Sequence, residues 1–216
     1  MFERYEGMDL ASPQLNLAYD MKNTVLFKKN DQNFIYALTK TQLPVLKDLA
    51  LLDIYLSQGN IVEPHWHPNS AELVYVVKGE IVISVLNPNT KELLSYRLKA
   101  AQTVYIPMGW FHWQVAMEDN TQFLAVFDNS LPETVLESDV LLKTPKDVLQ
   151  LAYGINGEEL EQVLAPLTES VLIGPPVPQR TEQLEYLEQR AQDHYQPNYA
   201  SAAGSHQQWR IGNYQP

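Results

Sequence analysis

Two histidines and a glutamate, close together in the sequence, have the spacing of metal ligands. His65 and His67 lie two residues apart in a segment whose neighbours predict a strand, so both side chains should leave the same face of that strand. Glu72 follows the turn-forming run Pro68-Asn69-Ser70 and should begin the next strand. The pattern therefore places three potential ligands on two consecutive strands.

A third histidine follows a second predicted turn. Pro107 and Gly109 mark that turn, and His112 stands at the start of the aromatic strand after it. Three imidazoles and one carboxylate from separate strands would form a site for a divalent metal without a sulfur ligand. The chain has 5 His, and three of them fall in these two short segments. The alternative, four ordinary polar residues on an exposed strand face, needs several independent spacings to coincide.

The segments around these residues predict an all-β structure. Short runs rich in β-branched and aromatic residues are separated by Pro, Gly and Asn turns, which is typical of a barrel or a sandwich. Apart from the two strands that carry the first three ligands, the predicted strands cover residues 34–39, 49–56, 81–86, 93–98, 103–106 and 123–127. A hairpin turn is expected at Asn87-Pro88-Asn89-Thr90.

Beyond residue 130 the pattern changes from strands to helices. The run Thr144-Pro145-Lys146-Asp147 predicts a helix start, with Thr144 as the cap, Pro145 at the first helical position and an acid in the first turn. Asn156 should begin a second helix that ends near Pro166. We therefore expect two short C-terminal helices, packed on the barrel or on a neighbouring subunit.

The length of 216 residues suffices for one domain with a core and some additions. We expect an N-terminal arm at 1–31, a β-barrel at 32–130, a helical extension at 131–170, and a linker and polar tail at 171–216. The arm would pair with the barrel edge or with a partner subunit. In the tail, residues 181–195 predict a weakly amphipathic helix, and His194 and His206 have no ligand spacing.

Charge and composition exclude several classes of partner. The net charge is −11, and no basic cluster offsets it, which argues against nucleic acid and anionic membranes. The chain has no cysteine, so neither a disulfide framework nor a thiolate ligand is available. No segment has the length and apolar character of a signal peptide or a membrane span. We expect a cytoplasmic protein, with association with a spore or coat left open.

The spacing around the first predicted ligands also resembles a known family. The segment has Gly59, then five residues, His65-Trp66-His67, four residues, Glu72, six residues and Gly79. It is similar to the first cupin motif at every signature position.

A second segment is similar to the core of the second cupin motif, with Pro107-Met108-Gly109, two residues and His112. It departs from that motif at Ala101, where glycine is common, and at Ala116, where asparagine is common. Neither is a ligand position, so the departures concern local turn geometry. The resemblance implies a cupin-type jelly-roll β-barrel that holds one divalent metal on His65, His67, Glu72 and His112.

Over roughly residues 34–165 the chain resembles the oxalate decarboxylase and germin-like group, as a single cupin where the decarboxylases carry two. The similar runs include residues 123–128 and 144–148. This resemblance implies manganese first, then iron, with zinc or nickel as further options, and a small organic acid as substrate. One departure argues against oxalate, because Val62 occupies the place of the arginine that clamps the substrate carboxylate in the decarboxylases.

Two carboxylates are candidates for catalysis. By strand alternation Glu63 shares a face with His65 and His67, unless Pro64 disturbs the phase. It would then accept an imidazole N–H, and the sharper alternative is a general base. Glu133 is the nearest counterpart of the family's acidic lid loop, and an ordinary surface acid is the alternative.

The expected function is a metal-dependent decarboxylase or oxidoreductase. The alternatives are a non-enzymatic cupin that binds a metal or metabolite as a coat, storage or sensor component, and a sugar isomerase or phenol dioxygenase of the cupin type. The resemblance also implies a homodimer, because single cupins of this kind commonly pair barrel to barrel. The N-terminal arm and the two helices offer apolar faces for that contact.

Overall fold

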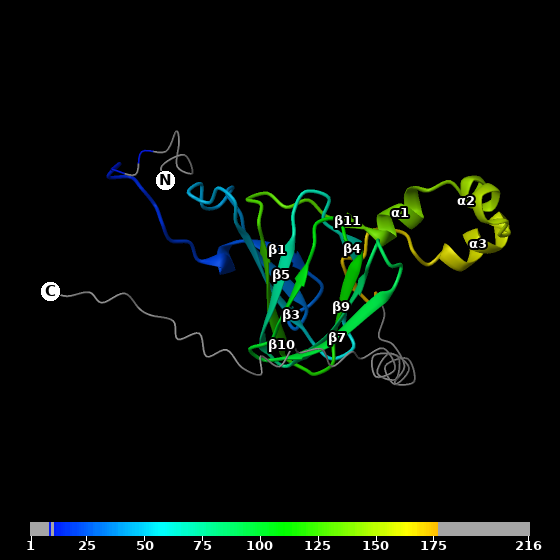
Figure 1. Ribbon diagram of the computed structural model, residues 1–216, viewed down its shortest axis with the longest axis horizontal. Coiled ribbons are helices and arrows are strands. Elements are labelled where there is room, and N and C mark those ends of the chain that lie inside the picture. The colour runs from blue at the N-terminus through cyan, green and yellow to red at the C-terminus, as the bar shows by residue number, and fades with distance from the viewer. Residues whose placement is uncertain (1–8, 10, 177–216) are drawn as a thin grey trace.

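Two antiparallel β-sheets face each other and form a barrel (Figure 1). The computed structural model describes residue 9 and residues 11–176. Sheet A contains, in spatial order, β1 (Val25–Lys28), β2 (Phe34–Leu38), β3 (Ala50–Leu56), β10 (Thr121–Phe127), β5 (Glu72–Lys78) and β8 (Thr103–Ile106). Sheet B contains β11 (Val135–Leu136), β4 (Ile61–Trp66), β9 (His112–Ala116), β6 (Glu80–Leu86) and β7 (Leu93–Lys99), and β12 (Ile173–Gly174) also pairs with β4.

The order of the strands defines a jelly roll. Sheet A ends in the four neighbouring strands β3, β10, β5 and β8, and sheet B in β4, β9, β6 and β7. The chain therefore crosses repeatedly from one sheet to the other, which is the double Greek key of a jelly roll. The predicted all-β, cupin-type jelly-roll barrel is confirmed.

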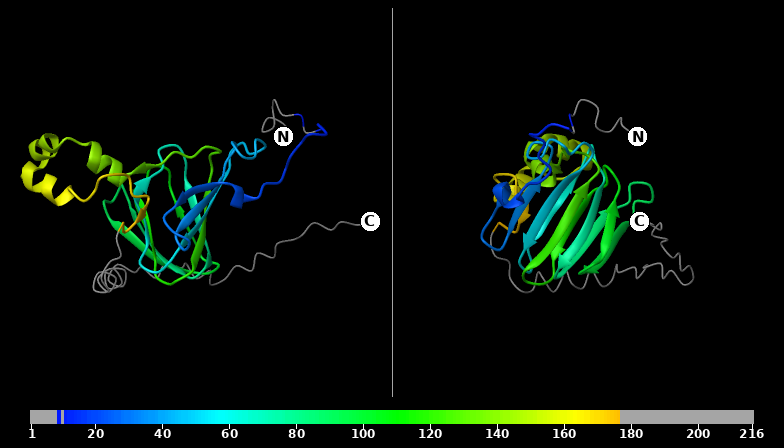
Figure 2. Two further views of the ribbon diagram at one scale, coloured as in Figure 1. Left: turned by 180° about the vertical axis from the view of Figure 1, so that it is seen from behind. Right: turned by 90° about the vertical axis from the view of Figure 1, so that its left-hand side faces the viewer.

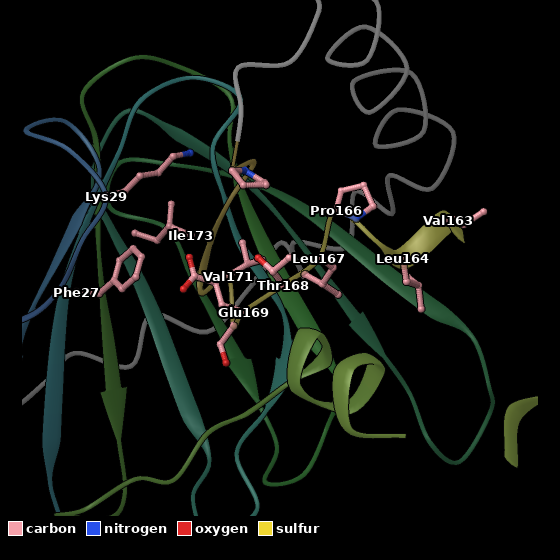
Figure 3. A pocket seen from close by; sticks show the side chains of 12 residues that line it. Phe27, Lys29, Val163, Leu164, Pro166, Leu167, Thr168, Glu169, Val171 and Ile173 are labelled. Atoms are coloured by element: carbon pink, nitrogen blue, oxygen red, sulfur yellow. The ribbon is translucent and has the colours of Figure 1, made fainter. Parts of the chain in front are cut away.

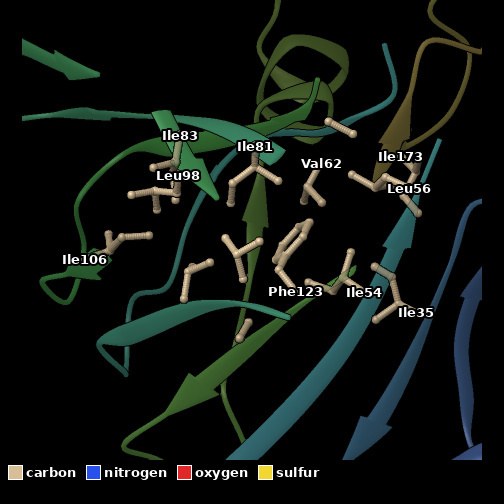
Figure 4. Close-up of a cluster of buried hydrophobic side chains, with 14 of the residues drawn as sticks. Ile35, Ile54, Leu56, Val62, Ile81, Ile83, Leu98, Ile106, Phe123 and Ile173 are labelled. Atoms are coloured by element: carbon tan, nitrogen blue, oxygen red, sulfur yellow. The ribbon is translucent and has the colours of Figure 1, made fainter. Parts of the chain in front are cut away.

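Strand alternation fills the space between the sheets with apolar side chains (Figure 4). Phe123 on β10 and Ile54 on β3 project inward from sheet A, and Ile81 on β6 meets them from sheet B. Each such side chain contributes about 1.5–3 kcal/mol when it is fully buried. The barrel therefore has an apolar core that does not depend on a metal.

Within the described residues, three helices follow the barrel, where two were predicted in that range. Helix α1 (Glu137–Lys143) packs on β4, whereas α2 (Lys146–Tyr153) and α3 (Gly157–Leu164) pack on each other and project away from the sheets (Figure 1). The side chain of Asn156 caps α3, as predicted. Thr144 was predicted to cap α2 and instead ends α1, where its hydroxyl donates to the Val140 carbonyl oxygen at 2.6 Å.

Both ends of the described chain pair with the barrel. Within the predicted arm, β1 pairs with β2, and Figure 2 shows it at one edge of sheet A. Within the range 171–216, expected to be linker and tail, Ile173 is buried and β12 pairs with β4. The helix predicted at 181–195 lies outside the described residues. No helix in the described part of the chain is long and apolar enough to cross a membrane.

Candidate metal centre

The four predicted ligands meet inside the barrel. His65 lies on β4 and His67 directly after it, Glu72 begins β5, and His112 begins β9. One side-chain nitrogen or oxygen from each lies within 4.8 Å of the others. All four are buried, with at most 4% of any of them exposed. The structure thus brings together the residues that the motif spacing singled out.

Pairing of the strands accounts for this convergence. His65 and His112 lie opposite each other in the β4–β9 ladder. Glu72 comes from the facing sheet, and the backbone N–H of Gly109 donates to the His67 carbonyl oxygen at 2.9 Å, which ties the two motif loops together.

The outer ring nitrogen of each imidazole bonds to a backbone carbonyl. A carbonyl oxygen only accepts, so each Nδ1 carries a proton, and in the neutral imidazole each Nε2 keeps its lone pair toward the centre. Metal-binding histidines are generally fixed in this way. The acceptors are the carbonyl oxygens of Glu63 for His65 (2.7 Å), Glu133 for His67 (2.8 Å) and Trp110 for His112 (2.8 Å).

The inner nitrogens surround the Glu72 carboxylate. Glu72 Oε2 lies 2.9 Å from Nε2 of His112, a hydrogen bond that needs a second proton on this imidazole, and 3.2 Å from Nε2 of His67. The second contact has the distance of an ion pair but lacks hydrogen-bond geometry, so Nε2 of His67 is a buried polar atom without a hydrogen-bond partner. A lone pair held beside a carboxylate is unfavourable unless a cation lies between them. The donor set therefore fits a divalent metal.

Protonation states in the site also suit a metal. Burial first, and then the neighbouring His112 and His67, together lower the pKa of His65 to about 3. Burial alone would raise the pKa of Glu72, but its interactions with His112 and His67 outweigh that effect and hold it below its usual range. His65 is therefore neutral and Glu72 ionised at neutral pH, the forms that bind metal.

Glu63 does not face the imidazoles, in contrast to the prediction from alternation. The β4–β9 register shifts between Val62 and His65, so Val62 and His65 share the inner face and Glu63 turns outward. Its buried carboxylate accepts from the backbone N–H of Ser138 (2.9 Å), the Ser138 hydroxyl (2.6 Å) and the backbone N–H of Leu172 (2.9 Å). Only its backbone carbonyl bonds to an imidazole. Strand alternation is therefore interrupted near Pro64. The His65 imidazole bonds to the backbone carbonyl of Glu63 and not to its carboxylate.

Glu133 lies in the loop between β10 and β11, with its side chain exposed. Its backbone N–H donates to Asn69 Oδ1 at 2.8 Å, and its carbonyl oxygen accepts from His67. The main chain of this loop therefore fixes His67, one of the four candidate metal ligands. The exposed Glu133 carboxylate can contact solvent or a bound small molecule.

Sequence reasoning missed the groups that support the ligands. The ring of Phe127 packs edge-on against His67, with ring centroids 4.8 Å apart. In the sequence, Phe127 looks like any buried strand residue. Every residue has a backbone carbonyl, so the sequence cannot show which carbonyls accept from the imidazoles. Only a resemblance-based alignment of the surrounding strands could have drawn attention to them.

The two departures from the second motif have different surroundings. Ala101 has a left-handed backbone, with φ of 67°, in the turn between β7 and β8. A glycine, the residue common at this motif position, adopts that conformation without steric cost. Ala101 adopts it with some backbone strain. Ala116 is buried in the core, and its carbonyl oxygen accepts from the Gly59 N–H at 2.9 Å.

A separate groove lies away from the metal centre. It has a volume of about 540 Å³ and runs between β1 and the segment that follows α3 (Figure 3). Phe27, Leu167 and Val171 contribute to its apolar walls, and Lys29 and Glu169 lie at its rim. None of the four candidate ligands lines it.

Comparison with known proteins identifies the family. The cupin family model matches residues 22–161, and the chain belongs to the cupin family. Over 129 residues it is 30% identical to oxalate decarboxylase OxdC of Bacillus subtilis, a match that covers 58% of this chain and 33% of that protein. It is 29% identical over 143 residues to the 12S seed storage protein CRD of Arabidopsis thaliana, covering 64% and 32%. The chain therefore spans about a third of the length of these relatives.

Solved structures show the same fold. The oxalate decarboxylase from Bacillus subtilis at pH 4.6 superposes with a TM-score of 0.65 at 24% identity, covering 79% of this chain and 46% of that one. A second oxalate decarboxylase structure, described for its substrate binding mode, gives a TM-score of 0.67 at 25% identity, covering 84% and 46%.

Proposed function

We propose that this chain is a metal-dependent enzyme that decarboxylates or oxidises a small organic acid. His65, His67, Glu72 and His112 would hold the metal. The observation that carries the proposal is the convergence of three fixed imidazole Nε2 atoms and one ionised carboxylate in a buried site. The oxalate decarboxylase of Bacillus subtilis has Mn(II) centres, which supports manganese first, with iron next and zinc or nickel after them.

The surroundings of the site limit the substrate. A bound divalent metal would supply a Lewis acid that polarises a carboxylate oxygen. With Glu72 ionised, the metal and its ligands would carry one net positive charge. Among the described residues, the buried polar and charged side chains include no lysine or arginine, and Val62 is part of the apolar core. The site therefore favours an acid with one carboxylate over a dianion such as oxalate.

Metal analysis and turnover assays test this proposal. The purified protein would be loaded with manganese or iron, and its metal content measured. Oxalate, glycolate, pyruvate and related acids would then be assayed under air and under nitrogen. We expect turnover of a monocarboxylate to exceed that of oxalate. A fully loaded protein that turns over no acid would rule out the enzyme proposal.

A second candidate is a non-enzymatic cupin that binds a metal or metabolite. It is favoured by two observations: in the part of the chain that the structure describes, no buried lysine or arginine lies beside the site, and the chain is similar to a seed storage protein. Thermal-shift screening of acids, sugars and phenols separates the two, because a ligand at a hundred times its dissociation constant adds about 2.7 kcal/mol of stability. Stabilisation by a compound that is not consumed would favour the binding protein. A sugar or phenol that is converted would indicate an isomerase or a dioxygenase instead.

A further inference from the structure

The groove between β1 and the segment that follows α3 has the size and the apolar walls of a small-molecule site. Phe27 comes from β1, whereas Leu167, Val171 and Ile173 come from the segment after α3 (Figure 3). The volume of about 540 Å³ lies within the range of about 300–1,000 Å³ that is typical of such sites. A ligand that enters this groove would exchange water for hydrocarbon contacts.

Both sides of the groove are fixed to the barrel. Phe27 packs against the apolar core, and β1 pairs with β2. On the other side, the backbone N–H of Leu172 donates to the Glu63 carboxylate at 2.9 Å, and the Leu172 carbonyl oxygen accepts from the Glu63 N–H at 3.1 Å. Pairing of β12 with β4 continues this contact. The groove is therefore formed before any ligand binds, so a ligand does not have to order it.

Lys29 places a positive charge at the rim of this groove. Its ammonium group donates to Asn60 Oδ1 at 2.7 Å and to the carbonyl oxygen of Pro175, and both acceptors are uncharged. Partial burial lowers the pKa of Lys29, and no carboxylate of the described chain offsets this effect. An ammonium group has three N–H bonds, so it can donate to one further acceptor. A carboxylate is the acceptor that would also compensate the charge.

The other charge at the rim does not favour a positive ligand to the same degree. Glu169 is exposed, so its carboxylate keeps its hydration and gains little from an ion pair. Lys29 is partly buried and has already lost some of its hydration, so it gains more from a counter-charge. The groove therefore favours an anionic head group, and its walls favour a hydrocarbon chain attached to that group.

We propose that this groove binds an amphipathic monocarboxylate, with the carboxylate at the Lys29 ammonium group and the hydrocarbon chain against Phe27 and Leu167. Lys29 also lines a second hollow of about 470 Å³, in which every other lining residue is uncharged, including Gln58 and Asn60. The head group would therefore lie among polar groups and water while the chain leaves water. None of the four candidate metal ligands lines the groove, so this site is separate from the metal centre.

Isothermal titration of the full chain with decanoate, below the micelle concentration of decanoate, tests this. The metal-free protein should bind one decanoate per chain, and the manganese-loaded protein should keep this site with the same dissociation constant. To the metal-free protein, acetate should bind at least tenfold more weakly because it lacks the chain. Decyltrimethylammonium should also bind at least tenfold more weakly because its head group is positive.

Lys29→Gln should raise the dissociation constant of decanoate at least tenfold, because it removes the charge that pairs with the carboxylate. Lys28→Gln is the matched control. It removes the same charge one residue earlier, where Lys28 pairs with Asp31 at 2.7 Å and does not line the groove. This variant should bind decanoate like the wild type. Leu167→Asp, in the segment after α3, places a charge in the apolar wall and should also weaken binding at least tenfold.

Circular dichroism checks that each variant is folded, and Leu167→Asp decides the test if Lys29→Gln does not fold. A metal-free wild type without saturable decanoate binding would overturn the proposal. So would equal weakening by Lys28→Gln and Lys29→Gln, or equal affinity for decanoate and decyltrimethylammonium. Binding that requires manganese would place the carboxylate on the metal and would equally overturn it. Because the decisive titration uses metal-free protein, its outcome does not depend on the proposed enzyme.

Discussion

Each imidazole in the metal centre is oriented by a main-chain carbonyl. Two of those carbonyls belong to glutamates whose side chains were predicted to take part in catalysis. The side chains of Glu63 and Glu133 are the predicted catalytic groups, whereas it is their backbone oxygens that hold His65 and His67. A substitution at either position therefore tests the side chain alone, because the carbonyl remains.

His67 is the ligand whose loss is easiest to interpret, because its Nε2 has no hydrogen-bond partner to lose. We expect His67→Ala to abolish stoichiometric metal binding and any activity while the barrel stays folded, since the apolar core does not include it. Elemental analysis and circular dichroism measure the two properties. His194→Ala, outside the described residues, serves as the control and should change neither. Near-full metal content in the folded His67→Ala variant would show that His67 is not a metal ligand.

The strand β4 bulges between Val62 and His65, and the bonds of the Glu63 carboxylate anchor this bulge. Glu63 should position His65 in this way. In Glu63→Gln the new amide cannot accept from every donor of Ser138 and Leu172, and an unsatisfied buried N–H costs about 1–3 kcal/mol. We expect lower stability together with about tenfold weaker Co²⁺ binding and a changed Co²⁺ absorption spectrum.

Glu80→Gln controls for a purely structural effect. Glu80 is also buried and pairs with Arg97 and Lys99 away from the metal centre. It should lose stability with an unchanged Co²⁺ spectrum. If both variants leave the spectrum unchanged, Glu63 supports the fold and not the ligand.

At the scale of elements, the turn between β7 and β8 carries a removable strain. Ala101 has φ of 67°, which costs an L-residue about 1–2 kcal/mol, partly offset by the greater flexibility of glycine in the unfolded chain. Ala101→Gly should therefore raise the free energy of unfolding by about 0.5–1 kcal/mol in urea titrations. Ala100→Gly, one residue earlier and without positive φ, should lower it. A loss of stability in Ala101→Gly would contradict this assignment.

The strands were predictable because their signals are local. Alternation, β-branched residues and turn residues mark β2, β3, β6, β7, β8 and β10, and the motif spacing marks the four ligands. Helix α1 lacks such a signal, since Leu136 at its N-cap offers no side-chain bond and Thr144 serves its end. Strand β12 consists of two residues whose partner β4 lies far away in the sequence.

The orientation of Glu63 shows a different limit of prediction. Alternation is reliable only within an unbroken ladder, and one extra residue between Val62 and His65 reverses it. Pro64 signals that the ladder is broken, because proline donates no hydrogen bond, but it does not say which neighbour turns outward. That depends on Ser138 and Leu172, which are far from Glu63 in the sequence and near it in the fold.

For the whole molecule, the buried site makes stability depend on pH. The ordinary pKa of histidine is 6.5, whereas that of His65 is lowered to about 3 in the folded chain, first by burial. Below pH 6.5, His65 therefore becomes protonated in the unfolded chain but stays neutral in the folded chain. The free energy of unfolding falls as the pH falls toward 3. Glu72, with its pKa lowered from 4.5, acts in the same direction below pH 4.5.

We therefore expect the metal-free protein to lose stability steadily between pH 6.5 and pH 3, as measured by urea unfolding at several pH values. The metal-loaded protein should lose it more steeply, because protons compete with the metal for the imidazoles. A metal-free protein equally stable at pH 7 and pH 4 would show that the imidazoles are accessible to protons in the folded state.

The bonds of the Glu63 carboxylate also set an order of events during synthesis. Its partners Ser138 and Leu172 lie 75 and 109 residues further along the chain. At about 5–20 residues per second, the ribosome makes Leu172 about 5–20 s after Glu63. Through that interval His65 and His67 are already synthesised, but the Glu63 carboxylate lacks the partners that it has in the folded chain. A metal ion present during translation would meet these two imidazoles before the contacts that fix His65 exist.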